Sequence, residues 1–395
     1  MAVQRDSRTF KQAASLTRLG YRSIVVEAEP SAALDGSLPF ELITVGGRPE
    51  TPAAPPVQRG TPQRQPSRLG RAAAPVTGVA HFIVQHAARC RAVAAATPRA
   101  DLYYLHSQVL FPAVWWRALR ARVPFVYDAH DLYWTLREDG RELTPAARGI
   151  WIILDAMERL CAARARECIT VGAGVAGLAE ARFKRPFTIV RNAHDTRLDD
   201  NSAPNLRARL GLAADDFLIA VSGNYKRGLA VEPLLAALPR LPEHVHVAFV
   251  GAGYQPLSAP RAHFVPPVAP TQIVPLLRTA DVAAVPYFPS STSVRHALPN
   301  GFFHAVAAGL PMLYPRDLVD ARKLAERHRL GWEIDPCSTD SIIAAVTFVH
   351  DDPDTLASAR AHVEAAGDEL SWIREEQVLA RLVRGVIGDC DTRSR

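Results

Sequence analysis

Apolar residues along the chain fall into two recurring patterns, short continuous runs and longer stretches with apolar residues three to four positions apart. A short apolar run predicts a buried strand, and the spacing of three to four predicts an amphipathic helix. In the first half, strands are predicted at 23–28, 40–47, 101–107, 124–130, 168–172 and 187–192, and helices at 6–20, 78–96, 112–122, 147–166 and 173–182. Only "MAVQ" and Arg5 precede the first helix, so either a very short strand stands there or the sequence begins slightly late.

The same alternation starts again after the polar segment 193–205, which is interpreted as a hinge. Strands are predicted at 216–224, 245–253, 262–267, 281–287 and 310–315, helices at 230–241, 270–280 and 300–308, and mainly helices from there on. Because strand and helix alternate in two successive blocks, the sequence predicts an α/β protein with two doubly wound parallel sheets and a cleft between them. The expected domains are 1–195 and 205–370, with 371–395 as a helix that packs back on the first domain.

Composition agrees with a two-domain globular protein of 395 residues, 48% hydrophobic and 22% charged. Segment 48–76 holds seven prolines and a basic bias, which predicts a mobile surface loop. The chain has no run of about 18 apolar residues and no apolar segment at its start, so neither a membrane-spanning helix nor a secretory signal is expected.

The distribution of charge and of cysteines argues against a nucleic-acid-binding protein and against a cysteine metal site. The net charge of +6 comes almost wholly from scattered arginines, without a nucleic-acid motif, so no nucleic-acid partner is expected. Five cysteines without metal-ligand spacing indicate reduced cytosolic thiols and no metal site. The segment "WWRALRAR" (115–122) has two interpretations, contact with an anionic membrane or ordinary packing of one helix face.

Two strand-to-helix loops in the second half are candidates for anion binding. "VSGNYKRGL" brings Gly223, Asn224, Lys226 and Arg227 directly after a strand, where backbone N–H groups and cations can hold a phosphate. A solvated loop with ordinary surface charges explains the same residues. "FVGAGY" places Gly251 and Gly253 after the next strand, either for close approach of a ligand or for a tight turn.

The segment "RHALPNGFFHAVAAGLP" (295–311) is more informative. Leu298, Pro299 and Asn300 precede a helix whose free N–H groups suit a diphosphate, and Gly301 allows close approach. His304 lies one turn into that helix, and His296 lies eight residues before it. Each histidine can also be explained without a role in binding: His304 as a core histidine bonded to a neighbour, and His296 as a loop histidine.

"VYDAHDLYW" (126–134) places His130 and Asp131 just past the end of a buried strand. A histidine at such a strand end can hydrogen-bond a substrate hydroxyl or act as a base. The alternative is a turn histidine followed by a helix-capping aspartate.

Together these motifs resemble the GT-B glycosyltransferases, specifically the retaining glycosyltransferase family 4 type. The resemblance covers most of the chain and depends on the order of "SLTRLGY", "VYDAHDLY", "ECITVGAGVAGLAEARF", "GNYKRGL", "VGAGY", "LLRTADVAAVPY" and "ALPNGFFHAVAAGLP". It implies two Rossmann-like domains that face each other across a cleft, with the nucleotide sugar on the C-terminal domain and the acceptor on the N-terminal domain.

The resemblance also implies roles for single residues. Arg227 matches the family's cation before Gly-Leu, whereas Asn224 stands where arginine is common. His130 matches a histidine that faces the donor sugar. His296 and His304 stand where the family has two glutamates, the second of which binds the ribose hydroxyls; a neutral imidazole can accept only one such bond.

The expected function is transfer of a sugar from a nucleoside diphosphate donor to a hydroxyl acceptor, with retention and without metal or cofactor. Lys226 and Arg227 would stabilise the leaving phosphate, and Asp131 would lie on the acceptor side. The expected location is the cytoplasm, with the inner face of the membrane as a second expectation. Two alternatives stay open, a partner protein without catalysis and a sugar-nucleotide epimerase on the same fold.

Overall fold

A computed structural model describes residues 6–28, 38–46, 68–130, 132–135, 143–202, 205–226, 228–254 and 257–393. The chain forms two compact units. Unit 1 comprises Met1–Ile169, Phe183–Thr188 and Leu379–Arg395, and unit 2 comprises Thr170–Arg182 and Ile189–Val378. The expected hinge at 193–205 therefore lies within unit 2.

The described strands follow the predicted order along the chain. Their bounds are β1 Ile24–Glu27, β2 Glu41–Thr44, β3 Tyr103–Leu105, β4 Phe125–Asp128, β5 Glu167–Thr170, β6 Thr188–Ile189, β7 Phe217–Ser222, β8 Val245–Val250, β9 Ala262–Val265, β10 Val282–Ala284, β11 Met312–Pro315 and β12 Gly331–Ile334. The sequence missed β12, because "GWEI" is short and carries a charged residue among its four.

The described helices alternate with these strands. They are α1 Ser7–Arg18, α2 Arg68–Ala96, α3 Phe111–Ala121, α4 Pro145–Arg164, α5 Ala173–Phe183, α6 Leu206–Leu210, α7 Glu232–Ala237, α8 Ile273–Leu277, α9 Thr292–Arg295, α10 Asn300–Ala307, α11 Val319–His328, α12 Thr339–Asp351, α13 Pro353–Gly367 and α14 Trp372–Arg393. Among these described helices none is both long and apolar enough to cross a membrane.

Unit 1 contains two parallel sheets rather than the single sheet that the alternation predicts. β1 and β2 form a two-stranded sheet, in which Ile24 pairs with Glu41. The larger sheet has the order β3-β4-β5-β6, and β4 at its centre is buried along its whole length. Because neighbouring strands run parallel, the carboxyl ends of β3 and β4 meet at one edge.

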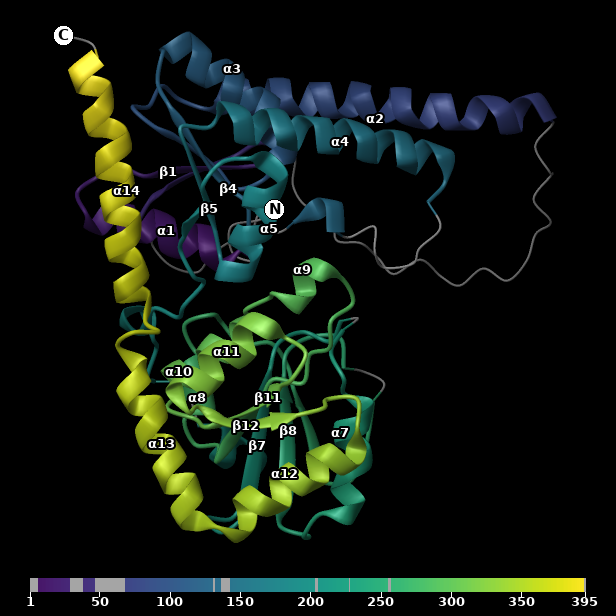
Figure 1. Ribbon diagram of the computed structural model, residues 1–395, viewed down its shortest axis with the longest axis vertical. Coiled ribbons are helices and arrows are strands. Elements are labelled where there is room, and N and C mark those ends of the chain that lie inside the picture. Colours follow the sequence, from purple (N-terminus) through teal and green to yellow (C-terminus); the bar gives the residue numbers. More distant parts are fainter. Residues whose placement is uncertain are drawn as a thin grey trace. The chain divides into compact units, whose positions relative to one another are not determined.

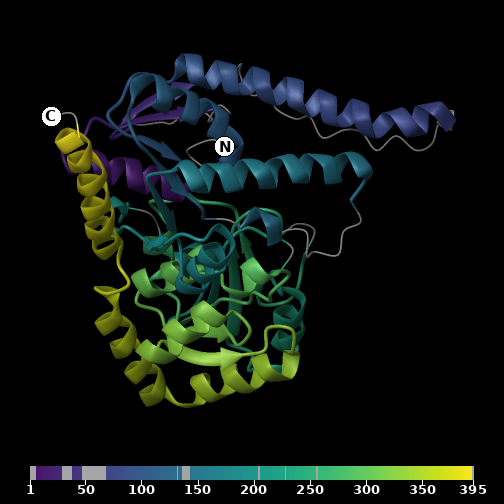
Figure 2. The ribbon, with the colours of Figure 1, turned by 45° about the horizontal axis from the view of Figure 1, so that its top comes forward.

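The prediction of a loop up to residue 76 was wrong in its last part. α2 begins at Arg68, ten residues before the predicted helix, and residues 47–67 lie outside the described part of the chain. "RLGRAAA" consists mainly of strong helix formers, and this propensity outweighs Pro75 within the helix. α2 and α4 lie side by side in Figures 1 and 2. They pack closely where a Cβ on Gly149 would stand 3.0 Å from Val79 Cγ2.

Unit 2 is a six-stranded parallel sheet with helices on both sides. The strand order is β12-β11-β10-β7-β8-β9. In Figure 1, α8, α10 and α11 lie on one side of these strands and α7 and α12 on the other. β7 and β10 are buried at every position, as expected for strands covered on both faces. This doubly wound sheet confirms the predicted architecture of the second half.

Candidate functional site

The candidate site of unit 2 lies where its sheet reverses direction. β8 and β9 follow on one side of the first strand, β7, and β10, β11 and β12 lie on the other. In open α/β sheets, ligands bind outside the carboxyl ends of the strands at such a reversal. At this point β7 ends with Ser222 and β10 with Ala284, and the following loops carry Gly223 and Tyr287. The predicted donor loop therefore stands at the edge of the sheet where this fold binds ligands.

The loops that follow β7 and β8 pack backbone against backbone. A Cβ atom on Gly251 would overlap the carbonyl group of Gly223, and a Cβ on Gly223 would lie 3.0 Å from the Tyr287 hydroxyl oxygen. Gly251 also has a φ angle of 157°, which side chains rarely adopt. The sequence assigned Gly251 to close approach of a ligand or to a tight turn. In the structure, the neighbouring loop is what requires the glycine.

Hydrogen bonds join the same two loops. The Ala252 N–H donates to Asn224 Oδ1 over 2.8 Å, and the Tyr254 hydroxyl donates to the Gly223 carbonyl oxygen over 2.6 Å. A Cβ on Gly253 would lie 3.3 Å from the Tyr225 Cβ, so Gly253 also keeps the loops close. Asn224 thus joins the two loops.

Lys226 provides an exposed positive charge in the first loop. Its Nζ lies 5.3 Å from the centre of the Tyr287 ring, a cation–π contact. Burial raises the pKa of Tyr287 to about 12, so this ring stays neutral. The lysine is exposed and can meet an anion at the sheet edge. Arg227, the other predicted cation, lies outside the described residues.

Helix α10 begins directly against the end of β7. A Cβ on Gly301 would lie 3.0 Å from the Ser222 carbonyl oxygen, so only glycine fits there without displacement. Pro299 is the N-cap residue and supplies no side-chain hydrogen bond to the first amides. The exposed Asn300 accepts a hydrogen bond of 2.8 Å from the Asn192 amide group. Helix α10 therefore begins at the sheet reversal, and the Phe302 N–H of its first turn donates to the Pro299 carbonyl oxygen over 3.0 Å.

His304 is anchored to this same edge. Its Nδ1 lies 3.1 Å from Ser222 Oγ, and its ring meets the His194 ring edge to face with centres 5.7 Å apart. His194 Nε2 in turn lies 2.7 Å from Asp199 Oδ1. The histidine is therefore fixed against the end of β7.

His296 is held in a different way. Its Nδ1 lies 3.0 Å from Asp320 Oδ1, and Asp320 Oδ2 accepts a hydrogen bond of 2.7 Å from the Gly174 N–H at the start of α5. A Cβ on Gly174 would overlap the His296 ring, so glycine makes room for this pair. His296 is consequently tied to Asp320 by a contact that sequence spacing did not indicate.

A pocket of about 510 Å³ opens next to this pair within unit 2. Its wall combines the start of α5 with one face of α11 and part of α14. The lining residues are Gly172, Ala173, Gly174, Ile189, Arg191, His296, Leu298, Asp320, Lys323, Leu324, Glu375 and Val378. Of the predicted donor residues, His296 and Leu298 line this pocket, whereas Gly223, Gly251 and His304 do not.

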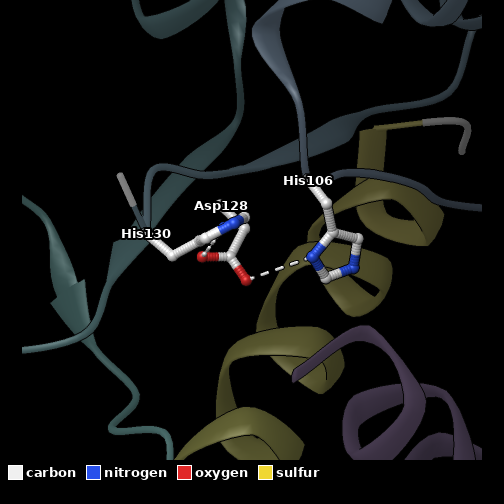
Figure 3. A group of neighbouring side chains, drawn as sticks. All are labelled: His106, Asp128 and His130. Atoms are coloured by element: carbon white, nitrogen blue, oxygen red, sulfur yellow. Dashed lines mark ion pairs between the residues drawn. The ribbon is translucent and has the colours of Figure 1, made fainter. Parts of the chain in front are cut away.

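Unit 1 contains a polar cluster at the carboxyl ends of β3 and β4. Figure 3 shows His106 and His130 on either side of the Asp128 carboxylate. His106 Nδ1 lies 3.4 Å from Asp128 Oδ2, and His130 Nδ1 lies 3.8 Å from Asp128 Oδ1. Arg8 from α1 donates two hydrogen bonds to Asp128, from Nε over 2.7 Å and from Nη2 over 3.0 Å. The predicted Asp131 lies outside the described residues.

The Asp128 carboxylate is buried yet ionised. Burial alone would raise its pKa, but the charge and hydrogen bonds of the Arg8 guanidinium, together with the nearby His106 and His130 rings, hold the pKa of Asp128 well below its usual range. Loss of Arg8 would leave the buried Asp128 charge unpaired, and loss of Asp128 would do the same to Arg8. Asp128 therefore carries a permanent negative charge between the two imidazole rings.

Sequence reasoning found His130 but missed His106, Asp128 and Arg8. His106 follows β3 just as His130 follows β4, so the strand-end argument applies equally to "DLYYLHS". Arg8 lies 120 positions from Asp128 in the chain, and no local pattern indicates that contact.

The folded chain belongs to the GT-B class of structures. Sucrose-phosphate synthase from Thermosynechococcus elongatus matches with a TM-score of 0.65 and 14% identity, over 96% of this chain and 92% of that one. WaaG, a glycosyltransferase involved in lipopolysaccharide biosynthesis, matches with a TM-score of 0.64 and 16% identity, over 97% and 95%. HepE from Anabaena in complex with UDP-glucose matches with a TM-score of 0.63 and 18% identity, over 96% and 95%.

These similarities confirm the predicted GT-B fold. No family model matches the chain, and no curated protein matches it by sequence. At 14 to 18% identity, the shared feature is the fold, whereas the chemistry depends on the residues of this chain.

Proposed function

We propose that the protein transfers a sugar from a nucleoside diphosphate donor to a hydroxyl-bearing acceptor. The observation that supports this most directly is the sheet reversal of unit 2, where the Gly223 loop, the start of α10 and His304 meet. That edge offers backbone N–H groups and a cation to a diphosphate. HepE, which has the same fold, has been crystallised with UDP-glucose.

Sugar transfer requires that the negative charge on the leaving diphosphate be stabilised. Lys226 and the first amides of α10 would supply it, together with Arg227. His304 would contact the ribose from its place against Ser222. His130 would orient the reacting sugar or the acceptor hydroxyl.

Finer features of the reaction depend on the resemblance alone. They are retention at the anomeric carbon, independence of metal and cofactor, and a cytoplasmic location with contact to the inner face of the membrane. The proton NMR coupling constant of the anomeric hydrogen in the product measures the first of these. Neither the nucleotide base nor the acceptor follows from the described residues.

A thermal-unfolding panel with UDP, GDP, dTDP and ADP tests the donor site. A nucleotide at about 100 times its dissociation constant stabilises the folded state by about 2.7 kcal/mol. For a domain of this size, the midpoint should rise by roughly 2–4 °C with one of the four. His304→Ala should reduce that shift, whereas His362→Ala on α13 should not. If no nucleotide changes the midpoint, the donor-site proposal is refuted.

One observation favours a second function, a partner protein without catalysis. Both histidines that stand in place of the family's glutamates are engaged within the protein, His304 with Ser222 and His296 with Asp320. A protein that binds no nucleotide needs no side chain at these two positions to accept hydrogen bonds from ribose hydroxyls. The same panel separates the two functions, because the partner protein would show no shift with any nucleotide.

A further inference from the structure

Two histidines of unit 2 approach each other closely near the amino-terminal end of β8. His244 comes directly before this strand, and His350 lies in the last turn of α12. Their Nε2 atoms are 2.6 Å apart, and their ring centres are 4.7 Å apart. The two residues stand 106 positions apart in the chain, so no spacing in the sequence indicates that they form a pair.

The neighbouring Asp351 determines which nitrogen of His350 carries the hydrogen. Asp351 Oδ1 lies 2.7 Å from His350 Nδ1, so the carboxylate accepts a hydrogen bond from that nitrogen and leaves the lone pair on Nε2. Histidine ligands of metal ions characteristically bond a carboxylate through their other nitrogen in this way. The Asp351 side chain is 63% exposed and adds negative charge beside the pair, which favours a cation.

Phe217 at the start of β7 holds both histidines in place. Its N–H donates to the His244 carbonyl oxygen over 2.8 Å. Its ring meets the His350 ring edge to face, with the centres 5.5 Å apart. The backbone of His244 and the ring of His350 are therefore fixed to the same buried residue, so the close approach of the two rings follows from the packing of unit 2.

A hydrogen bond between the rings is the simpler explanation of this contact, and it requires the hydrogen on His244 Nε2. The separation of 2.6 Å is shorter than the roughly 2.7–3.2 Å over which N–H groups ordinarily donate. A metal ion with two nitrogen bonds of about 2.0–2.1 Å at a tetrahedral angle holds the nitrogen atoms about 3.3 Å apart. The exposed His244 ring reaches that separation by moving less than about 1 Å.

A second histidine pair lies close by, but its nitrogen atoms are already engaged. His246 Nδ1 lies 3.1 Å from His263 Nε2, and His246 Nε2 lies 3.6 Å from Asp216 Oδ1. Both nitrogen atoms of His246 thus face a partner. The two converging nitrogen atoms of the first pair therefore define the candidate site, and water completes the coordination on the exposed side of His244.

We propose that His244 and His350 bind a divalent ion of the late first-row metals, Cu²⁺, Ni²⁺ or Zn²⁺, through their Nε2 atoms. Imidazole nitrogen suits these ions, whereas Mg²⁺ and Ca²⁺ prefer oxygen ligands. When the ion binds, it replaces the hydrogen on His244 Nε2, and that ring takes the tautomer with hydrogen on Nδ1. Asp351 keeps the hydrogen of His350 on Nδ1, so the His350 lone pair already points at the ion.

The ion at this site is structural. His244 precedes β8 and Gly251 follows it, so the site and the loops that would hold the diphosphate lie at opposite ends of this strand. The ion joins the start of β8 to the end of α12, two segments that the unfolded chain does not bring together, and so stabilises the folded unit. The inference is therefore independent of the proposed sugar transfer.

Equilibrium dialysis of the protein without a histidine tag measures the binding of Cu²⁺, Ni²⁺ and Zn²⁺ in turn. We expect one ion per chain at this site, with Cu²⁺ bound more tightly than the other two. His244→Asn and His350→Asn should each weaken binding by about tenfold or more, and Asp351→Asn by about tenfold. His263→Asn changes the neighbouring pair instead and should match the wild type.

Two results overturn the proposal. One is a wild-type protein that binds none of the three ions. The other is equal affinity of the wild type and the variants at 244 and 350, which would leave the hydrogen bond as the explanation of the contact. An ion held elsewhere, for instance by His106, Asp128 and His130 of unit 1, gives this second result, because these variants leave that cluster unchanged.

Thermal unfolding and diffraction provide a second, independent test. Zn²⁺ at about 100 times its dissociation constant should raise the unfolding midpoint of the wild type by roughly 2–4 °C, and EDTA should reverse the shift. His350→Asn should unfold like the wild type without metal but show a smaller shift with Zn²⁺. In crystals soaked with Zn²⁺, anomalous scattering should place the ion about 2.0–2.1 Å from both Nε2 atoms. Equal shifts in both proteins, or an ion at another position alone, contradict the site.

Discussion

Gly251 is a residue at which the structure allows no side chain. Its Cβ would overlap the backbone of Gly223, and backbone is far harder to displace than a flexible side chain. Gly177 on α5 is a useful contrast, since a Cβ there would meet no atom within 4 Å. Two glycines in the same unit therefore differ sharply in their tolerance of one added methyl group.

We expect Gly251→Ala to lower the free energy of unfolding by at least about 2 kcal/mol, through strain and the forced separation of two loops. Gly177→Ala should raise it by about 0.5–1 kcal/mol, because alanine is the better residue in an exposed helix. Urea titrations of the two variants beside wild type measure both changes. Equal stabilities for the two variants would show that the loops separate at no cost.

A second residue-scale prediction concerns His246 and His263, which lie on adjacent strands with Nδ1 and Nε2 3.1 Å apart. Burial lowers the pKa of both below the ordinary 6.5. The folded state thus binds fewer protons than the unfolded state, so stability is full above about pH 6.5 and falls as the pH drops toward the folded-state pKa.

His263→Gln should therefore weaken the loss of stability between about pH 7 and 5. Asp216, Arg261, His244 and Arg207 act on His246 and remain in the variant, so the difference in slope between variant and wild type reports the loss of His263. Denaturant unfolding at several pH values measures the effect, with the exposed His81→Gln as control. A slope unchanged from wild type would show that the pair does not titrate on unfolding.

At the scale of elements, α3 combines exposed apolar side chains with positive charge. Trp116 and Leu119 are 54% and 57% exposed, and the Arg120 guanidinium stacks over the Trp116 ring at 5.2 Å. The helix contains no acidic residue. Such a face fits the membrane interpretation of this segment, whereas the packing interpretation accounts for the buried Phe111 and Ala113.

Trp116→Ala with Leu119→Ala should weaken binding to vesicles of phosphatidylglycerol and phosphatidylcholine by about tenfold or more, since two apolar side chains lose their burial in lipid. Salt should weaken the wild-type interaction as well. Co-sedimentation measures both effects. Phe348→Ala on α12, where Phe348 is also 54% exposed, is the matched control. Equal binding by all three proteins would leave only the packing interpretation.

The start of α2 shows a case in which helix propensity and the positions of the prolines predict different structures. The prolines of segment 48–76 predicted a loop, but α2 already begins at Arg68. One proline removes one backbone hydrogen bond, which a run of arginine, leucine and alanine compensates. Conversely, β12 was missed because strand pairing with β11, rather than its own four residues, determines it.

At the scale of the whole molecule, alternation along the chain predicted an α/β protein with two doubly wound parallel sheets, because apolar runs between amphipathic helices are local in sequence. The GT-B fold was predicted from the resemblance of the motifs. The division of unit 1 into two sheets was not predicted, since strand order depends on distant contacts. The same distinction holds for the site. Loop glycines and strand-end histidines follow from local patterns, whereas Arg8 with Asp128 and His296 with Asp320 are contacts across 120 and 24 positions.

The bonds between the loops after β7 and β8 have a mechanical consequence. Asn224 holds Ala252, Tyr254 holds the Gly223 carbonyl, and the Tyr225 N–H donates to the Ala252 carbonyl over 2.8 Å. Neither loop can swing outward alone without breaking all three. The two loops are therefore expected to move together, and under the proposed function a nucleotide would meet loops that are already joined, so binding would cost little conformational entropy.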